Sequence, residues 1–363
     1  LEISMPTAGF RHRWLSSVLR GGALLFAIAW GSASSPRVHA GSEPASNAFR
    51  MDVGGLMFGD LYHVASSHSE KGDGATGAVL RRGYLTFDAG FGRRWDARLR
   101  LEANQSGEYE QYDFKTDYKD VHVGLNFGEG GRQRLTIGLA PTPTFDVIEA
   151  IWGRRYLAPT PLDLQGIASR DTGIFAKGPL NDSGSLAYRL MAAPSATLGS
   201  DNNDAKKWMG ALTWRPTDEW TIDAYADHES RSDSGDRTIV QLFTAYATDG
   251  FRVAAQYSDQ DREDEPSLKL ASVFAVQQIT ERTALVGRVD HLFKPSPKGD
   301  GIAYLPFDPS AKATFFLLGV EWKLREYFTV TPNLAATVYA RNDDGVRPDA
   351  DLNLRLTLFL NLE

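Results

Sequence analysis

Period-two alternation is the feature that most constrains the fold of this chain. From Leu352 to Leu362 every second residue is leucine, and the residues between them are mostly polar. Such alternation predicts a strand with one apolar and one polar face. It recurs in roughly 16 segments, a number typical of large barrels. The expected strands are residues 48–66, 79–90, 93–104, 118–128, 132–141, 170–178, 185–194, 205–215, 219–229, 237–248, 250–259, 268–278, 281–293, 312–324, 327–341 and 350–362.

The connections between these segments alternate between short and long. Seven are short, such as Gly90 to Arg93 and Arg215 to Glu219. The others are mostly longer and rich in Asp, Ser and Gly. An even-stranded antiparallel barrel collects its short turns at one end. The sequence therefore predicts an all-β protein, a 16-stranded antiparallel transmembrane β-barrel with long external loops and short periplasmic turns.

The two faces of each strand differ in what they can contact. The polar face carries groups such as Thr221, Asp223, Tyr225 and Asp227, and we expect a polar inner face on every strand. Inward charge on nearly every strand would be costly in a dry core but is tolerated in a water-filled lumen. The leucines from 352 to 362 are then expected to face lipid, because no second apolar layer exists to cover them.

Aromatic residues gather near the short turns, on the apolar face of their strands. Strand enrichment alone would scatter aromatics over both faces and both ends. Their placement predicts an aromatic girdle at one rim of a membrane-spanning barrel. The girdle residues are Trp95, Phe127, Trp214, Trp220, Phe251, Trp322 and Phe328.

The first 40 residues are typical of an export signal. An apolar run at residues 23–30 follows three arginines and precedes a small-x-small site that ends at Ala40. The run is too short to cross a bilayer as a helix. We expect residues 1–40 to be a cleaved signal peptide and residues 41–363 to form a single barrel domain. Export followed by barrel formation predicts a location in the bacterial outer membrane, reached through the periplasm.

Composition excludes several classes of function. The formal net charge is −7, and without residues 1–40 the chain keeps 35 basic and 45 acidic residues. A net charge of −10 argues against nucleic acid as a partner. Cysteine is absent, which excludes disulfides, thiolate chemistry and cysteine-ligated metals. We expect neither a metal nor a cofactor.

One connection, residues 141–169, breaks the polar pattern of the others. It is the longest and the most apolar, and such structured loops usually have a function. We expect it to fold into the barrel as a constriction, although packing on the barrel rim or at a subunit contact is the alternative. Fixed charges would then line a narrow passage. The expected constriction residues are Asp146, Glu149, Arg154 and Arg155.

Charged residues of both signs lie at the strand positions that belong to the polar, inward-facing side. The expected lumen-lining residues are Arg82, Asp96, Arg98, Arg100, Glu102, Arg134, Arg189, Asp223, Arg252 and Arg355. Asp88, Asp227 and Glu321 have the same parity. This mixture predicts a lumen with both charges and leaves the sign of its ion selectivity open.

Three stretches carry a resemblance to a known family. They are "VLRRGYLTFDAGFGRRWDARLRLE", "YKDVHVGLNF" and "IASRDTGIFAKGPL", all within residues 79–180. The pattern resembles the phosphate-selective porin O/P family, whereas the second half agrees mainly in strand rhythm. The resemblance implies a trimer of 16-stranded barrels, each with a water-filled pore and an inward-folded third loop. That family owes its anion selectivity to arginine and lysine clusters, and lysine is sparse on the strands here.

Taken together, these features predict a porin through which small hydrophilic or ionic solutes diffuse passively. The family resemblance favours anions among them. A barrel that sheathes a partner protein in an outer-membrane conduit is one alternative. A barrel enzyme is another, but the histidines nearest to serine or acid, His68 and His228, lack a recognisable catalytic context. We therefore expect no enzymatic activity.

Acidic runs mark three expected external loops, at residues 201–204, 259–265 and 342–344. Such runs are usually solvated surface. They could also hold divalent cations that bridge the protein to anionic lipopolysaccharide. The expected partners are thus outer-membrane lipid and lipopolysaccharide, further copies of the chain in a homotrimer, and small solutes.

Overall fold

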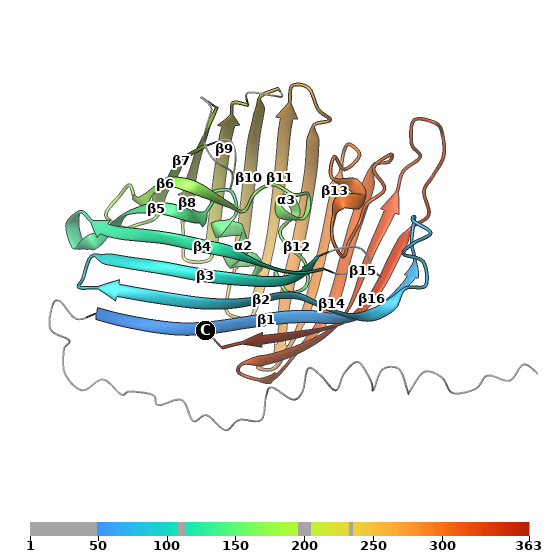
Figure 1. Ribbon diagram of the computed structural model, residues 1–363, viewed down its shortest axis with the longest axis horizontal. Coiled ribbons are helices and arrows are strands. Elements are labelled where there is room, and N and C mark those ends of the chain that lie inside the picture. Colours follow the sequence, from blue (N-terminus) through green and yellow to red (C-terminus); the bar gives the residue numbers. More distant parts are fainter. Residues whose placement is uncertain (1–48, 107–112, 195–204, 232–234, 363) are drawn as a thin grey trace, which may run out of the picture. The chain divides into compact units, whose positions relative to one another are not determined.

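The computed structural model describes residues 49–106, 113–194, 205–231 and 235–362. In these residues sixteen strands form one closed antiparallel barrel, in which each strand pairs with its sequence neighbours and β1 pairs with β16 (Figure 1). The expected all-β fold, a closed 16-stranded antiparallel barrel, is confirmed. The strands are β1 (Phe49–Ser66), β2 (Thr76–Phe91), β3 (Trp95–Ser106), β4 (Asp113–Phe127), β5 (Gln133–Pro141), β6 (Arg170–Pro179), β7 (Leu186–Pro194), β8 (Lys206–Trp214), β9 (Trp220–Glu229), β10 (Arg237–Ala247), β11 (Phe251–Arg262), β12 (Leu268–Thr280), β13 (Thr283–Leu292), β14 (Ala313–Arg325), β15 (Phe328–Tyr339) and β16 (Asp351–Asn361).

The largest boundary difference is at the start of β4, which begins at Asp113 rather than at residue 118. Its first residues are mostly polar, but they continue the ladder with β3, where Asp117 lies opposite Glu102 and Asp113 opposite Ser106. Backbone pairing thus extends β4 beyond the alternating apolar pattern. The expected signal peptide and the acidic run at 201–204 lie outside the described residues. No helix in the described part of the chain is long and apolar enough to cross a membrane.

The leucine face of β16 lies on the outside of the barrel. Arg355 and Thr357 are buried and bond to interior groups, whereas Leu354 on the other parity is 43% exposed. Phe359, which shares the parity of Arg355, stacks on Tyr156 with ring centroids 4.3 Å apart. Because successive strand residues point to opposite faces, the remaining leucines of β16 face outward as expected.

The expectation of a polar inner face on every strand is wrong for one side of the barrel. Phe243 of β10, Phe274 of β12 and Phe315 of β14 are buried and lie on inner-face parity. They belong to one apolar cluster with Trp152, whose ring lies 4.9 Å from that of Phe274, and Phe243 in turn contacts Phe274. Apolar inner residues are stable here because protein, rather than water, fills this part of the interior.

Two β-bulges turn additional cations inward. The register of β1 and β2 skips Arg81 between Leu80 and Arg82, and that of β3 and β4 skips Lys119. Arg81 is buried, and its Nε lies 2.8 Å from Asp60. Lys119 Nζ lies 3.1 Å from Glu102. A bulge places two successive side chains toward one face, which strict alternation does not allow.

Candidate functional site

The connection from Thr142 to Ser169 lies within the ring of strands and contains two short helices, α2 (Asp146–Trp152) and α3 (Pro161–Leu164) (Figure 1). Helix α2 forms because its apolar residues are three to four positions apart, so Ile148 and Trp152 are buried on one face. Gly153, with a φ of 60°, ends the helix in the left-handed region and donates its N–H to the carbonyl of Glu149.

Side chains from around the barrel hold this interior segment through its backbone carbonyls. Arg189 of β7 donates to Pro143 at 3.2 Å, and Gln241 of β10 donates to Thr144 at 3.0 Å. Arg252 of β11 donates to Ile151 at 2.8 Å, and Arg355 of β16 donates to Leu157 at 3.2 Å. Further bonds come from Arg81 on β2 and Arg288 on β13. Since these strands surround the segment, it crosses the interior and is not a rim loop.

The four expected constriction residues belong to three ion-pair groups. Asp146 lies 3.0 Å from Arg189 Nε, and Arg154 Nε lies 3.1 Å from Glu321 on β14. Glu149 and Arg155 contact each other, and Arg155 also contacts Asp163 of α3. The structure therefore pairs Glu149 with Arg155, while Asp146 and Arg154 have partners on opposite parts of the wall.

The wall that faces Arg155 carries a second set of charges. Arg82 contacts Glu102 at 2.5 Å, and Glu102 also contacts Lys119. Asp120 of β4 lies 2.6 Å from Arg170 and 3.8 Å from Arg100. Together with the interior segment these groups form the basic cluster, in which cations outnumber carboxylates. Its members are Arg81, Arg82, Arg100, Lys119, Arg155, Arg170 and Lys298 with Asp60, Glu102, Asp120, Glu149 and Asp163.

A cavity of about 280 Å³ opens beside the basic cluster. Arg81, Arg82, Arg155 and Lys298 line it, and its one acidic lining residue is Asp163. Nη2 of Arg155 is buried and donates no hydrogen bond to the described protein atoms. Within the described residues no carboxylate lies within ion-pair distance of the Lys298 ammonium. Near the cavity, one nitrogen of Arg155 thus has no hydrogen-bond partner among the described residues, and the Lys298 ammonium interacts with Asp163 only at longer range.

The carboxylates of the interior segment differ in how readily they ionise. Burial disfavours the ionised form of Asp163, whose side chain is 12% exposed, but Arg155, Arg82 and Lys119 outweigh that burial and hold its pKa below the ordinary value. For Asp146, burial dominates over Arg189 and Lys177, so its pKa is raised. Asp163, which cations surround, therefore ionises more readily than an ordinary aspartate, and Asp146 ionises less readily.

The other expected lumen-lining residues form ion pairs or hydrogen bonds along the inner wall. Arg98 Nε lies 2.7 Å from Asp88, and Arg134 Nη2 donates to Asp96 at 2.6 Å. Arg189 contacts Asp223 at 3.0 Å in addition to Asp146, and Thr213 donates to the same Asp223. Arg100 donates to Thr86, Arg355 to Asn333, and Arg252 to the interior segment. Whether these residues line the path of a solute stays a prediction.

The expected girdle residues lie at strand ends beside the short turns. Trp95, Trp214, Trp220 and Trp322 are exposed, as is Phe127, while Phe251 and Phe328 are partly buried. All seven share the outer-face parity of their strands. Their role at a membrane rim stays a prediction.

The two histidines considered for catalysis differ in their surroundings. Both ring nitrogens of His68 bond to carboxylates, Nδ1 to Asp351 and Nε2 to Asp300, each at 2.8 Å. His228 is exposed and contacts Thr238 and Asp236. A general base needs one nitrogen free to accept a proton from a nucleophile, and His68 has neither to spare in this arrangement.

Sequence reasoning missed several members of the basic cluster. Arg81 and Lys119 lie on the outer-face parity of their strands and turn inward only through the bulges. The one sequence signal for Arg81 and Lys119 is that each directly precedes an inner-face charged residue in the sequence. Lys298 lies in the connection between β13 and β14, and nothing in the local sequence places it beside Asp163.

Solved structures share this fold at low sequence identity. An anion-selective porin from Comamonas acidovorans matches with a TM-score of 0.61 and 14% identity, over 87% of this chain and 100% of that one. The outer membrane channel DcaP of Acinetobacter baumannii matches with a TM-score of 0.59 and 11% identity, over 86% and 97%. In vitro folded OmpT of Vibrio cholerae, in a trimer form, matches with a TM-score of 0.56 and 12% identity, over 87% and 100%.

No family model and no curated protein matches the sequence. At these identities the structural likeness establishes the barrel fold alone.

Proposed function

We propose that this protein is a passive diffusion channel of a bacterial outer membrane that prefers small anions. The observation that carries this proposal is the cavity beside the interior segment, where Arg81, Arg82, Arg155 and Lys298 face a single carboxylate. A narrow passage with excess fixed positive charge raises the local concentration of anions and repels cations. The fold shared with an anion-selective porin and with an outer membrane channel supports the proposal.

Several finer statements belong to the same proposal. Residues 1–40 direct export and are removed, residues 41–363 form the barrel, and residues 141–169 form its constriction. The resemblance to the phosphate-selective porin O/P family favours oxyanions among the solutes, but the mixed charge of the lumen argues for modest selectivity. A homotrimer is supported by that resemblance and by the trimer form of a protein with the same fold. Outer-membrane lipid and lipopolysaccharide would surround it.

The two alternatives have less support. A conduit that sheathes a guest protein needs an open interior, whereas here the interior segment bonds to strands on all sides. An enzyme needs a nucleophile beside a base, and His68 is saturated by two carboxylates. We therefore propose that the protein has no enzymatic activity.

The test is single-channel recording of the refolded protein in a planar bilayer under a KCl gradient. Stepwise conductance with a reversal potential of the sign expected for chloride is the predicted result. Silence from folded, heat-modifiable protein would contradict a diffusion channel and would favour the conduit or the enzyme. Conductance that prefers potassium would retain the channel and reject the anion preference.

A substitution at Lys298 tests the role of the cavity. Lys298→Gln removes a charge that has no ion-pair partner, so the barrel should fold normally. One unit charge about 5 Å from an ion in water is worth on the order of 1 kcal/mol, so we expect the chloride-to-potassium permeability ratio to fall roughly threefold. Lys294→Gln is the matched control, because Lys294 lies in the same connection, outside the cavity lining. Equal effects of the two variants would mean that the cavity is not on the ion path.

A further inference from the structure

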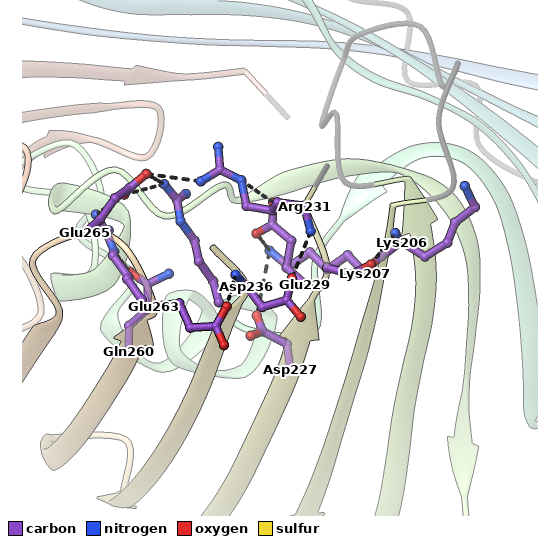
Figure 2. Close-up of polar contacts among 12 residues, drawn as sticks. Lys206, Lys207, Asp227, Glu229, Arg231, Asp236, Gln260, Glu263 and Glu265 are labelled. Atoms are coloured by element: carbon purple, nitrogen blue, oxygen red, sulfur yellow. Dashed lines mark hydrogen bonds and ion pairs between the residues drawn. The ribbon is translucent and has the colours of Figure 1, made fainter. Parts of the chain in front are cut away.

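A second charged cluster lies at the long-loop end of β9 to β12, away from the interior segment (Figure 2). Its centre is Glu265, in the connection between β11 and β12. Three arginines, Arg231, Arg237 and Arg262, direct their guanidinium groups at this one carboxylate. We call these three residues the arginine triad.

The triad binds the carboxylate as it would bind a small oxyanion. Nη2 of Arg237 donates to both oxygens of Glu265, at 2.7 and 2.6 Å. Arg231 Nη1 donates to Oε1 at 3.1 Å, and Arg262 Nη1 donates to Oε2 at 3.4 Å. Hydrogen bonds between guanidinium and carboxylate are among the strongest in proteins, and phosphate is held by the same geometry. The bond from Arg237 is the largest of the effects that keep the pKa of Glu265 below its ordinary value, so the carboxylate is ionised at neutral pH.

Two of the three arginines have contacts besides Glu265, and Nε of Arg231 also lies 3.9 Å from the Glu229 carboxylate. Nε of Arg262 donates to Gln260 at 2.6 Å, and the backbone N–H of Arg231 donates to Asp236 at 3.1 Å. Each arginine belongs to a different strand end, so three like charges converge from separate elements. Like charges at this separation repel, and a central anion is required to stabilise them. Glu265 supplies that anion from a short connection, and its side chain is 34% exposed.

The triad faces the mouth of the channel. Arg237 shares the parity of Ile239 and Gln241, and Arg262 shares that of Gln260 and Ser258, all of which are buried on the inner wall. Groups on this parity point into the lumen, not toward lipid. An oxyanion that reaches the triad therefore comes from the solution that enters the channel, which favours a free solute over the phosphate groups of a lipid.

We propose that the arginine triad is a binding site for small oxyanions, carboxylates or phosphate, at the channel mouth, and that Glu265 is its resident occupant. This inference rests on the proposed function, because it places the site on the path of a permeating solute. An incoming oxyanion displaces the Glu265 carboxylate, pairs with the triad, and is released when the side chain returns. Glu265 thereby keeps the site from holding its solute too tightly, which a conducting pore requires.

The experiment measures binding of inorganic phosphate to the detergent-solubilised, full-length protein by isothermal titration calorimetry at pH 7. In Glu265→Gln the competing carboxylate is absent. If that carboxylate occupies the triad about nine-tenths of the time, the apparent dissociation constant for phosphate should fall about tenfold. Glu263→Gln is the matched control, because it removes the same charge from the same connection and the Glu263 carboxylate accepts from the backbone N–H of Asp236 rather than from the triad. It should leave the constant unchanged.

Four outcomes would overturn the inference. The first is an unchanged phosphate dissociation constant in Glu265→Gln, and the second is an equal change of that constant in both glutamate variants. The third is tighter phosphate binding in Glu265→Gln that persists when Arg237→Gln is added. The fourth is tighter binding of purified lipopolysaccharide in Glu265→Gln without tighter binding of phosphate. If Glu265→Gln does not fold, Arg231→Gln in the wild-type background must weaken phosphate binding, and no weakening would reject the site. Bilayer recordings distinguish failure of the triad site from failure of the proposed function. Conductance without the expected change in phosphate affinity rejects only the triad site. The expected change in phosphate affinity without conductance rejects only the channel.

Discussion

At the scale of single residues, His68 shows how one side chain connects distant parts of the barrel. It lies between β1 and β2 and bonds to Asp351 at the start of β16 and to Asp300 in the connection between β13 and β14. Burial disfavours the charged ring, but these two carboxylates outweigh it and raise the pKa of His68 to about 9. The protonated imidazole therefore holds three segments together at neutral pH.

This raised pKa predicts a loss of stability at alkaline pH. The stabilisation is fully present below the ordinary pKa of 6.5 and is lost as pH rises through about 9. Screening at the exposed Asp300 limits the effect to on the order of 1 kcal/mol. The thermal midpoint in detergent, measured from pH 6 to pH 10, should fall across this window in the wild type and less in His68→Gln. The exposed His228→Gln is the control, and parallel curves for all three proteins would contradict the prediction.

At the scale of elements, the interior segment depends on apolar packing as much as on ion pairs. Trp152 at the end of α2 is 1% exposed, contacts Phe274 edge-on and donates its Nε1–H to Ala158 at 2.8 Å. The guanidinium of Arg288 lies 5.4 Å from its ring centroid. This aromatic anchor fixes the position of the charges that follow it, including Arg155, so packing determines where the electrostatic field lies.

Trp152→Ala should therefore loosen the segment while the barrel persists. Removing a buried aromatic side chain costs about 3–5 kcal/mol, and the sixteen-stranded ladder does not depend on this contact. We expect a larger mean conductance with frequent transitions between levels in single-channel records, and an unchanged heat-modifiable band on gels. Trp214→Ala removes an exposed tryptophan from the outer face and serves as the control. A quiet Trp152→Ala channel with wild-type conductance would show that the segment does not restrict the pore.

At the scale of the whole molecule, pairing of β1 with β16 from Leu56 to Ser66 closes the ladder of the described strands. Closure satisfies the backbone hydrogen-bonding groups that a bilayer could not solvate. On the outer face of the barrel, apolar strand side chains such as Leu85, Val123 and Leu212 are exposed. A surface of this kind suits lipid or a second copy of the chain.

The proposed homotrimer is tested on the intact assembly. Light scattering of the detergent-solubilised protein, corrected for bound detergent, should give three times the mass of one chain. Bilayer insertions should add conductance in groups of three equal levels, because each barrel carries its own pore. Single equal steps together with a monomer mass would reject the trimer and leave the channel proposal intact.

The sequence by itself determined the number of strands, their order and the face that residues outside the bulges take. Strand alternation is a local property, so Leu354 and Arg355 could be assigned to opposite faces from their spacing alone. The same reasoning placed residues 141–169 as an exceptional segment and Arg154 and Arg155 within it. It could not say that Arg154 pairs with Glu321, because that contact joins parts of the chain far apart in sequence. Nor could it say that Arg155 pairs with Asp163, because that contact depends on how the interior segment folds back on itself.

Only the tertiary structure decided the excess of positive charge beside the interior segment. Arg81 and Lys119 turn inward because bulges shift their strands, and a bulge reflects pairing with a neighbouring strand rather than the residue itself. The apolar interior at Phe243 and Phe274 likewise depends on the arrival of Trp152 from another part of the chain. The periodicity of a strand indicates which face of the barrel a residue lies on. Its ion-pair partners, the local net charge and its packing depend on the other parts of the chain that contact that face.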